Sequence, residues 1–418
     1  MNNTILRKSI ALAAAVTLAV GASACSAKSE AGGAAAGEEA GAVKTGEGIS
    51  GNTITLGLLG DLTGPFAALT TEENQGVQLY WDQVNEEGGV CGQYTVDFDT
   101  KDHAYNVQNA VSMYRQMTPN VLAYQVLVGG SHSAAVLQNA ESDNRLMVPS
   151  SATEHLASSE VVLTPAMLYN LDMELVMEYM LEQGVIAKGD TVGMIYLEGD
   201  YGEAAHKGAE AAAERNGLTL VASMVKPTDS DMTAQVNDAL SKDASAILIG
   251  SVPGHTSSVA TVLQSAGADV AMGGSWPSYS SSLLANTGGD YLAEHFYAAT
   301  MATTLEQGKG AEILKAYEEQ HGGAPETNQV AMGYGIAAMM HQVLDRACEN
   351  GDLTPEGVVQ AKKDLGTLTS DGVMPEMDYT RLGESPTREA WIVQLDKEAP
   401  GGLKTVSDGL YTSENLSE

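Results

Sequence analysis

Basic residues are scarce in this sequence. Lys and Arg together number 21 against 54 Asp and Glu in 418 residues, which gives a formal net charge of −33. A chain of this charge is repelled by phosphate backbones and anionic headgroups, so we expect neither nucleic-acid binding nor electrostatic docking on an anionic membrane. The acidity itself indicates only solubility.

Motifs for metal or phosphate chemistry are missing as well. The three cysteines form no Cys-x-x-Cys pair, the eight histidines show no metal-ligand spacing, and there is no phosphate-binding Gly-rich loop or His-Glu-x-x-His segment. The segment 129–133 comes close to Gly-x-Ser-x-Gly but lacks the final Gly. We therefore expect a protein that is not an enzyme and that needs no cofactor or metal, with a surface hydrolase as the least favoured alternative.

A short hydrophobic run lies near the N-terminus. Arg7 and Lys8 precede apolar residues 10–20, which are followed by small residues and Cys25. The run is shorter than the roughly 20 residues that span a bilayer, and no later run approaches that length. The basic residues, the short apolar run and the small residues after it together predict a signal peptide over residues 1–24.

The end of this segment allows two interpretations. Ala22-Ser23-Ala24 fits cleavage and release, whereas small residues directly before Cys25 resemble a bacterial lipobox, with Ala22 where Leu is usual. The residues from 26 to 50 are rich in Ala, Gly and Glu and predict a flexible tether. A tether favours lipidation, so we expect a lipidated Cys25 with its tether over 25–51, anchored to the outer face of the cell membrane.

Two cysteines remain after Cys25. An even pair in an exported chain predicts a disulfide between Cys91 and Cys348, although two unpaired thiols remain an alternative.

Apolar strand patterns alternate with helical patterns through the rest of the chain. A helix with Val77, Tyr80, Trp81 and Val84 at i, i+3, i+4 and i+7 is typical. The predicted strands are 53–59, 94–98, 121–128, 146–148, 191–197, 218–224, 246–249, 270–272, 296–299 and 391–395. Two successive runs of such alternation predict two α/β lobes, each a parallel sheet flanked by helices.

Ligands of parallel sheets bind at the carboxyl ends of the strands. The loops at these ends are rich in Gly, Ser and Thr and carry few charges. Ser131, His132 and Ser133 open a predicted helix, where a carboxylate is favoured, although a Ser there can equally serve as a helix cap. Ser150, Ser151 and Thr153 carry the same ambiguity. Tyr201 and Trp276 are candidate pocket walls, and Ser275 is a further candidate ligand-binding residue.

Several segments together resemble the type 1 periplasmic binding proteins, in the leucine/isoleucine/valine-binding group. The likeness runs from Asn52 to Leu403, and it depends on the order and spacing of the segments 54–65, 84–92, 195–202, 296–299, 333–334, 372–373 and 391–394. The resemblance implies two lobes joined by three crossovers, with a ligand cleft between them that closes by hinge motion. Its expected lobes are 52–168 plus 297–370 and 169–296 plus 371–418.

The resemblance also implies a function and site residues. It implies a monomeric binding protein that delivers an amino acid, amide, urea or small aromatic acid to an ABC permease in the membrane; a ligand sensor of the same fold is the alternative. The family's carboxylate and ammonium contacts fall on Ser131–Ser133 and Ser150–Thr153, and its pocket aromatics on Leu69 and Tyr201. Amino-acid binders carry an acid where this chain has Gly273-Gly274-Ser275-Trp276. A buried ammonium needs a counter-charge, so we expect a ligand with a flat or apolar group rather than a plain aliphatic amino acid.

Overall fold

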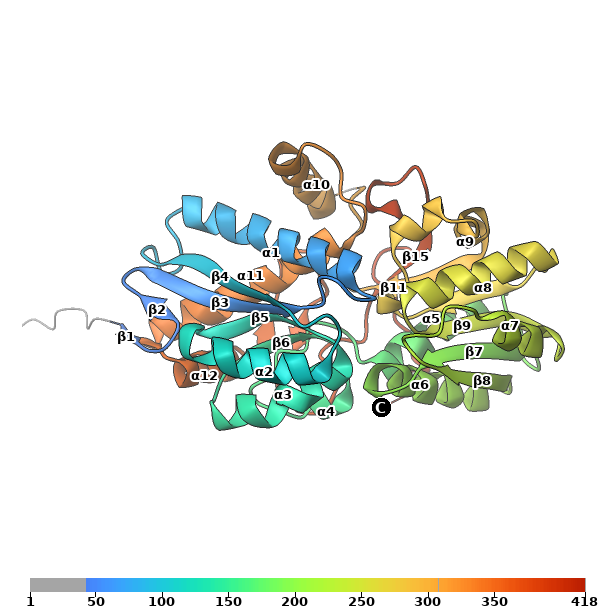
Figure 1. Cartoon of the computed structure of the whole chain (residues 1–418), viewed down its shortest axis with the longest axis horizontal. Helices are drawn as coiled ribbons and strands as arrows, with labels where there is room; N and C mark the ends of the chain where they lie inside the picture. The colour runs from blue at the N-terminus through green and yellow to red at the C-terminus, as the bar shows by residue number, and fades with distance from the viewer. Residues whose placement is uncertain (1–42, 307, 418) are drawn as a thin grey trace, which may run out of the picture. The chain divides into compact units, whose positions relative to one another are not determined.

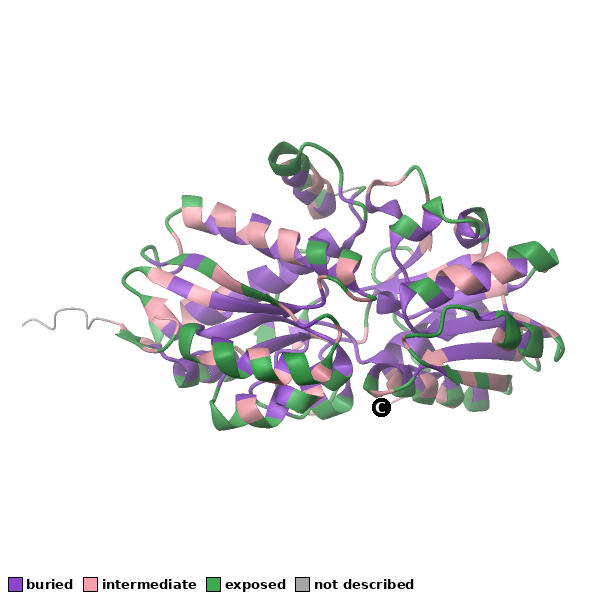
Figure 2. Cartoon of the chain, in the orientation of Figure 1, coloured by how far each residue is buried: buried purple, intermediate pink, exposed green. Residues whose placement is uncertain are grey.

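The computed structural model describes residues 43–306 and 308–417, and the predicted signal peptide and Cys25 lie outside them. Two sheets dominate the described chain, each with helices around it (Figure 1). Their buried strands are purple in Figure 2, while the outer faces of the helices are largely green or pink. The alternation expected from the sequence is therefore present, with apolar strands inside and amphipathic helices outside.

The first sheet is built on β3, whose last five residues are buried. β4 and β5 lie parallel to β3, and β6 lies parallel to β5. We call this sheet and its helices the first lobe. Its strands are β2 Ile49–Ser50, β3 Thr53–Gly60, β4 Thr95–Asp102, β5 Ala123–Val128 and β6 Met147–Ser150. Its helices are α1 Ala67–Glu86, α2 Val107–Met117, α3 Gly130–Ser142, α4 Glu154–Ala157, α10 Gly308–His321, α11 Gln329–Glu349 and α12 Pro355–Leu365.

The second sheet has seven strands in the order β16-β15-β11-β10-β9-β7-β8. We call this sheet and its helices the second lobe. Its strands are β7 Thr191–Leu197, β8 Thr219–Val225, β9 Ala244–Gly250, β10 Ala271–Gly274, β11 Phe296–Thr300, β15 Trp391–Leu395 and β16 Leu403–Thr405. Its helices are α5 Tyr169–Glu182, α6 Asp200–Asn216, α7 Thr233–Leu240, α8 Pro253–Ala266 and α9 Gly289–His295.

The expected parallel sheets are present, but each has an antiparallel edge. β15 runs antiparallel to β11, and β16 runs antiparallel to β15. The short connection between β15 and β16 explains the second pairing, because a parallel neighbour needs a long crossover. The first sheet also has an antiparallel edge, where β2 pairs with β3.

The chain passes between the two sheets three times, but two crossovers come later than the sequence suggested. β11 pairs with β10 and so extends the second lobe to residue 300, beyond the expected boundary at 296. The short strand β14 (Met377–Asp378) pairs with β13 (Thr367–Leu368), which keeps the chain beside α12 beyond the expected boundary at 370. Both boundaries were inferred from the family resemblance, which does not record the strand partners of this chain.

The folded part also begins before the expected boundary at residue 52. β1 (Lys44–Thr45) pairs with β12 (Asp352–Leu353), and β2 pairs with β3. Glu47 forms an ion pair with the buried Arg145, which also donates to the carbonyl of Val121. Residues 44–50 are therefore not tether but an edge of the first lobe.

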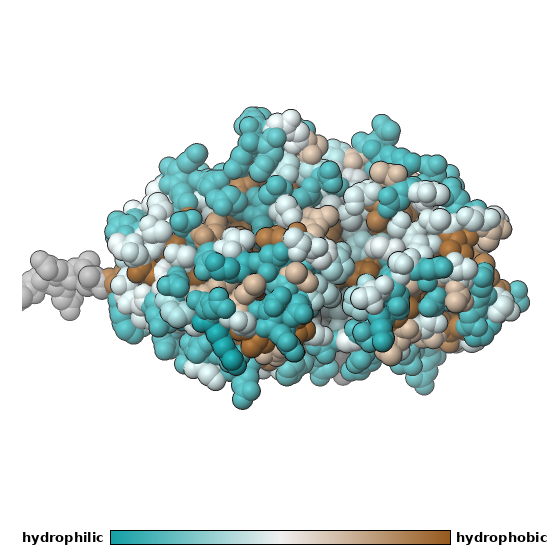
Figure 3. Space-filling view, viewed as in Figure 1, coloured by the Kyte–Doolittle hydropathy of each residue, from teal (hydrophilic) through white to brown (hydrophobic). Residues whose placement is uncertain are grey.

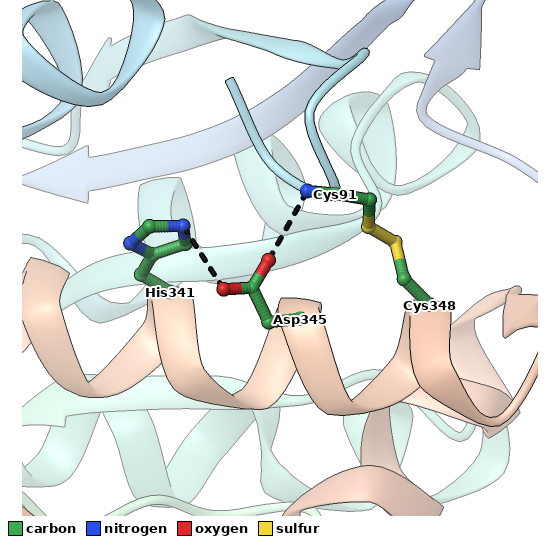
Figure 4. Close-up of a disulfide and its surroundings, with 4 residues drawn as sticks. All are labelled: Cys91, His341, Asp345 and Cys348. Atoms are coloured by element: carbon green, nitrogen blue, oxygen red, sulfur yellow. Dashed lines mark hydrogen bonds and ion pairs between the residues drawn. A yellow bond between two sulfur atoms is a disulfide. The ribbon is translucent and has the colours of Figure 1, made fainter. Parts of the chain in front are cut away.

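A disulfide joins Cys91 to Cys348 within the first lobe, across 257 residues of sequence. Cys348 lies on α11, and Cys91 lies in the turn after α1 (Figure 4). The carboxylate of Asp345, one turn before Cys348, accepts from the backbone N–H of Cys91 at 3.1 Å and pairs with His341 at 3.3 Å. The turn is thus held to α11 by a covalent and a polar contact.

Within the described residues, none of the helices combines the length and apolar character needed to cross a bilayer. In this described part of the chain, large hydrophobic side chains are exposed at three scattered positions, Met224, Leu382 and Leu410. The face drawn in Figure 3 is mainly hydrophilic, with hydrophobic residues in small separate groups.

Candidate functional site

A narrow cavity lies where the carboxyl ends of the strands of both lobes meet. The space inside it that the centre of a water molecule can reach is only about 30 Å³, well below the roughly 300–1,000 Å³ typical of small-molecule sites, so the two walls lie close together. The residues that line it are Phe66, Leu69, Thr70, Glu73, Tyr105, Val128, Gly129, Gly130, Ser150, Tyr169, Tyr201, Trp276, Pro277 and Gln329. The neighbouring strands β3 and β5 mark the point where the strand order of the first sheet reverses, which is where such sheets bind ligands.

One face of α1 forms much of the first-lobe wall. The buried Asp61 accepts from the N–H of Gly64 at 2.7 Å and of Phe66 at 2.9 Å, which fixes the turn between β3 and α1. From Phe66 on, Leu69, Thr70 and Glu73 follow at helical spacing and all line the cavity. The same spacing is visible in the sequence, but among so many acidic residues it did not single out Glu73.

The start of α3 forms the next part of this wall. Gly129 precedes the helix with a φ of 99°, which favours glycine, and no side chain caps the helix. The first N–H groups of a helix have no partner within it, so the backbone around Gly129 and Gly130 offers donors and a partial positive charge to the cavity.

The predicted side chains on α3 do not line this cavity. The helix begins one residue before Ser131, so the glycine backbone occupies the place that the sequence assigned to serine and histidine side chains. Ser131 is exposed, and Ser133 is buried and donates to the carbonyl of Leu127 at 3.4 Å. His132 is buried and stacks on the rings of His103 and Tyr105, with centroids 4.6 and 4.5 Å away. Burial lowers the pKa of His132 to about 4, so its ring is neutral.

The end of β6 brings one predicted serine to the cavity and leaves two residues out. Ser150 lines it and donates from Oγ to Oε1 of Glu73 at 2.6 Å. Ser151 is fully buried without lining the cavity, and Thr153 precedes α4, likewise away from the lining. Successive residues of a strand point to opposite faces, which separates Ser150 from Ser151.

The second-lobe wall is aromatic. Tyr169 lies 4.6 Å from Tyr201 and 5.8 Å from Trp276 between ring centroids. Tyr201 comes from the first turn of α6, and its hydroxyl bonds Ser275 Oγ at 2.7 Å and the carbonyl of Ser251. Tyr201 and Trp276 therefore line the cavity as predicted, whereas Ser275 lies behind Tyr201 and holds it in place.

A buried acid stands behind this wall as well. Asp172 on α5 is fully buried and accepts from the backbone N–H of Trp276 at 3.1 Å. Burial raises the pKa of Asp172 to about 8. Asp172 thus lies next to the segment after β10 in which the sequence lacks an acid, but it is not among the residues that line the cavity.

The lining offers no strong cation. The described residues of the lining include no Lys, Arg or His, and the one carboxyl group among them is that of Glu73. Among the described residues, no three His, Cys, Asp or Glu side chains gather closely enough to hold a metal ion. The arrangement suits non-covalent enclosure of a small organic molecule.

Known proteins share this architecture. A family model described as periplasmic binding protein matches residues 53–400. The solved structure of a fatty acid ABC transporter substrate-binding protein from Thermomonospora curvata is 35% identical, with a TM-score of 0.86, and the match covers 90% of this chain and 96% of that one.

Two curated proteins are also similar. Leu/Ile/Val-binding protein BraC3 of Rhizobium johnstonii is 22% identical over 346 residues, 76% of this chain and 93% of that protein. Leu/Ile/Val-binding protein homolog 3 of Brucella melitensis biotype 1 is 27% identical over 202 residues, 47% of this chain and 54% of that protein.

Proposed function

Because the chain belongs to the periplasmic binding protein family, in its type 1, leucine/isoleucine/valine-binding-like group, we propose that it is the substrate-binding protein of an ABC importer. It captures a small organic molecule between its lobes, does no chemistry on it, and delivers it to a permease in the membrane. The observation that carries this proposal is the lined cavity at the carboxyl ends of both sheets.

The two walls indicate how the ligand lies. The polar groups of Ser150, Glu73, Thr70 and Gln329 belong to the first lobe, and so do the N–H groups at the start of α3. The second lobe contributes Tyr169, Tyr201, Trp276 and Pro277. A ligand with a polar head toward the first lobe and an apolar or flat body against the aromatic rings fits this division.

The proposal includes export and attachment. A signal peptide and a lipidated Cys25 would hold the protein on the outer face of the cell membrane, as a monomer close to its permease. The lobes would open and close on the three crossovers.

Thermal unfolding of the full chain against a ligand panel tests this function. The panel contains branched-chain amino acids, amides, urea, aromatic acids and fatty acids. A ligand at 100 times its dissociation constant stabilises the folded state by about 2.7 kcal/mol, which raises the midpoint by a few degrees. We expect one class to raise the midpoint without being consumed. Consumption of the bound compound, or no shift after unfolding, extraction and refolding to remove a copurified ligand, would contradict the proposal.

A further inference from the structure

Glu73 is the one acid whose side chain lines the cavity, and it is 4% exposed. Its Oε1 accepts from Ser150 Oγ at 2.6 Å, and among the described residues no other group bonds its carboxyl. Phe66 and Leu69, which share its face of α1, are apolar. The carboxyl therefore lies in an apolar place with one neutral partner.

No described charge faces Glu73 from the surrounding elements. The neighbouring groups are Thr70 on α1, Ser150 on β6, Gln329 on α11, Tyr105 before α2, Tyr169 on α5 and Tyr201 on α6. Behind the walls stand His132, with its pKa lowered by burial, and Asp172, with its pKa raised by burial. Both are uncharged near neutral pH, so neither supplies a counter-ion.

Burial raises the pKa of Glu73 to about 7. The hydrogen bond from Ser150 lowers this pKa but offsets only part of the effect of burial. Near neutral pH the carboxyl of Glu73 therefore carries a proton in a large share of the molecules. A protonated carboxyl can donate a hydrogen bond, whereas an ionised one can only accept.

We propose that Glu73 determines the charge of the ligand: as a neutral acid it donates a hydrogen bond to the carboxylate of an apolar monocarboxylic acid. This inference rests on the proposed binding function and names its substrate class. A hydrogen bond from an O–H to a carboxylate is short and strong in an apolar site. The uncapped start of α3 lies on the same wall and supports the remaining negative charge.

An α-amino acid fits this wall less well. Its ammonium group has three donors and no acceptor, so Glu73 would have to ionise inside the apolar cavity to pair with it. The two ligand classes therefore move protons in opposite directions. A monocarboxylate makes Glu73 take up a proton, because a nearby negative charge raises the pKa of a carboxyl, and an ammonium makes it release one.

Calorimetric titration of the full chain at pH 7.5, in phosphate and in Tris, measures this proton exchange. The probes are octanoate, phenylacetate and leucine. We expect octanoate or phenylacetate to bind with proton uptake, with an affinity that falls between pH 7 and 9, by up to tenfold per unit. In Glu73→Gln, which keeps a donor and cannot titrate, we expect binding without proton exchange and an affinity independent of pH in this range.

Glu72→Gln is the matched control. Glu72 is the adjacent acid and is also buried, but it accepts from the N–H groups of Glu326 and Thr327 and does not line the cavity. This variant should keep the proton uptake and the pH dependence of the wild type.

Three results would overturn the inference. Leucine could bind with a proton release that Glu73→Gln abolishes, a monocarboxylate could bind with a pH-independent affinity, or none of the three probes could bind. The larger unfolding panel decides independently whether the protein binds any small molecule, so failure here leaves the proposed function testable.

Discussion

The two walls of the cavity differ in their chemistry and in how the lobes behind them are crosslinked. The first-lobe wall holds backbone donors, hydroxyls and the carboxyl of Glu73, on a lobe tied by a disulfide. The second-lobe wall consists of aromatic rings and a proline, and its one acid, Asp172, lies behind Trp276. The comparison indicates a division of labour, in which the first lobe supplies the groups for a polar head and the aromatic rings of the second lobe add to the apolar area that Phe66, Leu69 and Val128 already provide. Four experiments test this difference between the walls, and they follow in decreasing order of the change that we predict.

Removing the disulfide tests how much this crosslink stabilises the folded protein. In a Cys91→Ser/Cys348→Ser double variant we expect the free energy of unfolding to fall by about 2–5 kcal/mol, because the crosslink restricts the unfolded chain over a long loop. Denaturant unfolding measures the loss. The affinity for the best panel ligand should stay unchanged, since the disulfide is remote from the cavity lining. A large loss of affinity would mean that the disulfide shapes the site.

Truncating the aromatic wall tests the source of apolar contact. In Trp276→Ala we expect an affinity loss of about 2 kcal/mol or more, roughly 30-fold, because a buried aromatic side chain often dominates binding. Calorimetry with the best panel ligand measures it. Trp391→Ala is the matched control, because Trp391 lies on β15 and outside the lining. Equal losses in both variants would show that the effect comes from folding and not from contact.

The pH dependence of stability compares the acid of each wall. The folded-state pKa of Glu73, about 7, lies above its ordinary value of 4.5, so its contribution is fully present below pH 4.5 and is lost as the pH rises through 7. We expect the stability of wild type relative to Glu73→Gln to fall by at most about 3 kcal/mol between pH 4 and pH 8. Denaturant unfolding across this range measures the difference.

Asp172→Asn should show the same sign over a window that ends higher, because the folded-state pKa of Asp172 is about 8. If the stability of wild type relative to either variant did not change with pH, the folded-state pKa of that carboxyl would be ordinary, and the group would be ionised in the folded protein at neutral pH.

The smallest effect concerns the contact between the lobes at α4 and α6. Lys207 and Glu154 approach to 3.6 Å, and both side chains are about two-thirds exposed or more. Exposed pairs contribute little and are screened by salt. We expect Lys207→Ala to change ligand affinity only a few-fold at low salt and not at high salt, as measured by calorimetry at two ionic strengths. A large change would assign a role in closure to this pair.

Much of the fold could be predicted from local pattern. β7 occupies the predicted residues 191–197, because a continuous apolar run after a helix has few other interpretations. β1 and β2 could not be predicted in this way, because residues 44–50 are held by partners far along the chain, such as Arg145. The antiparallel edge of the second sheet also depends on pairing, which no local pattern records.

The site was predictable in its loops but not in its side chains. Leu69, Ser150, Tyr201 and Trp276 line the cavity, whereas Ser131, His132, Ser133, Ser151, Thr153 and Ser275 do not. A shift of one residue at the start of α3, or along β6, moves a side chain to the other face, and loop sequences do not specify that register. Glu73 was hidden by the number of acids around it, and its place in the cavity lining, which depends on the fold, distinguishes it from other buried acids such as Glu72.

The pairing of residues 44–50 with the first lobe has a mechanical consequence. A pull on the chain ahead of residue 43 would be borne by β1, β2 and the ion pair of Glu47 with Arg145, all of which belong to one lobe. The second lobe would carry none of this load, because only the three crossovers reach it. A protein held at this end would thus keep its first lobe fixed while its second lobe moves.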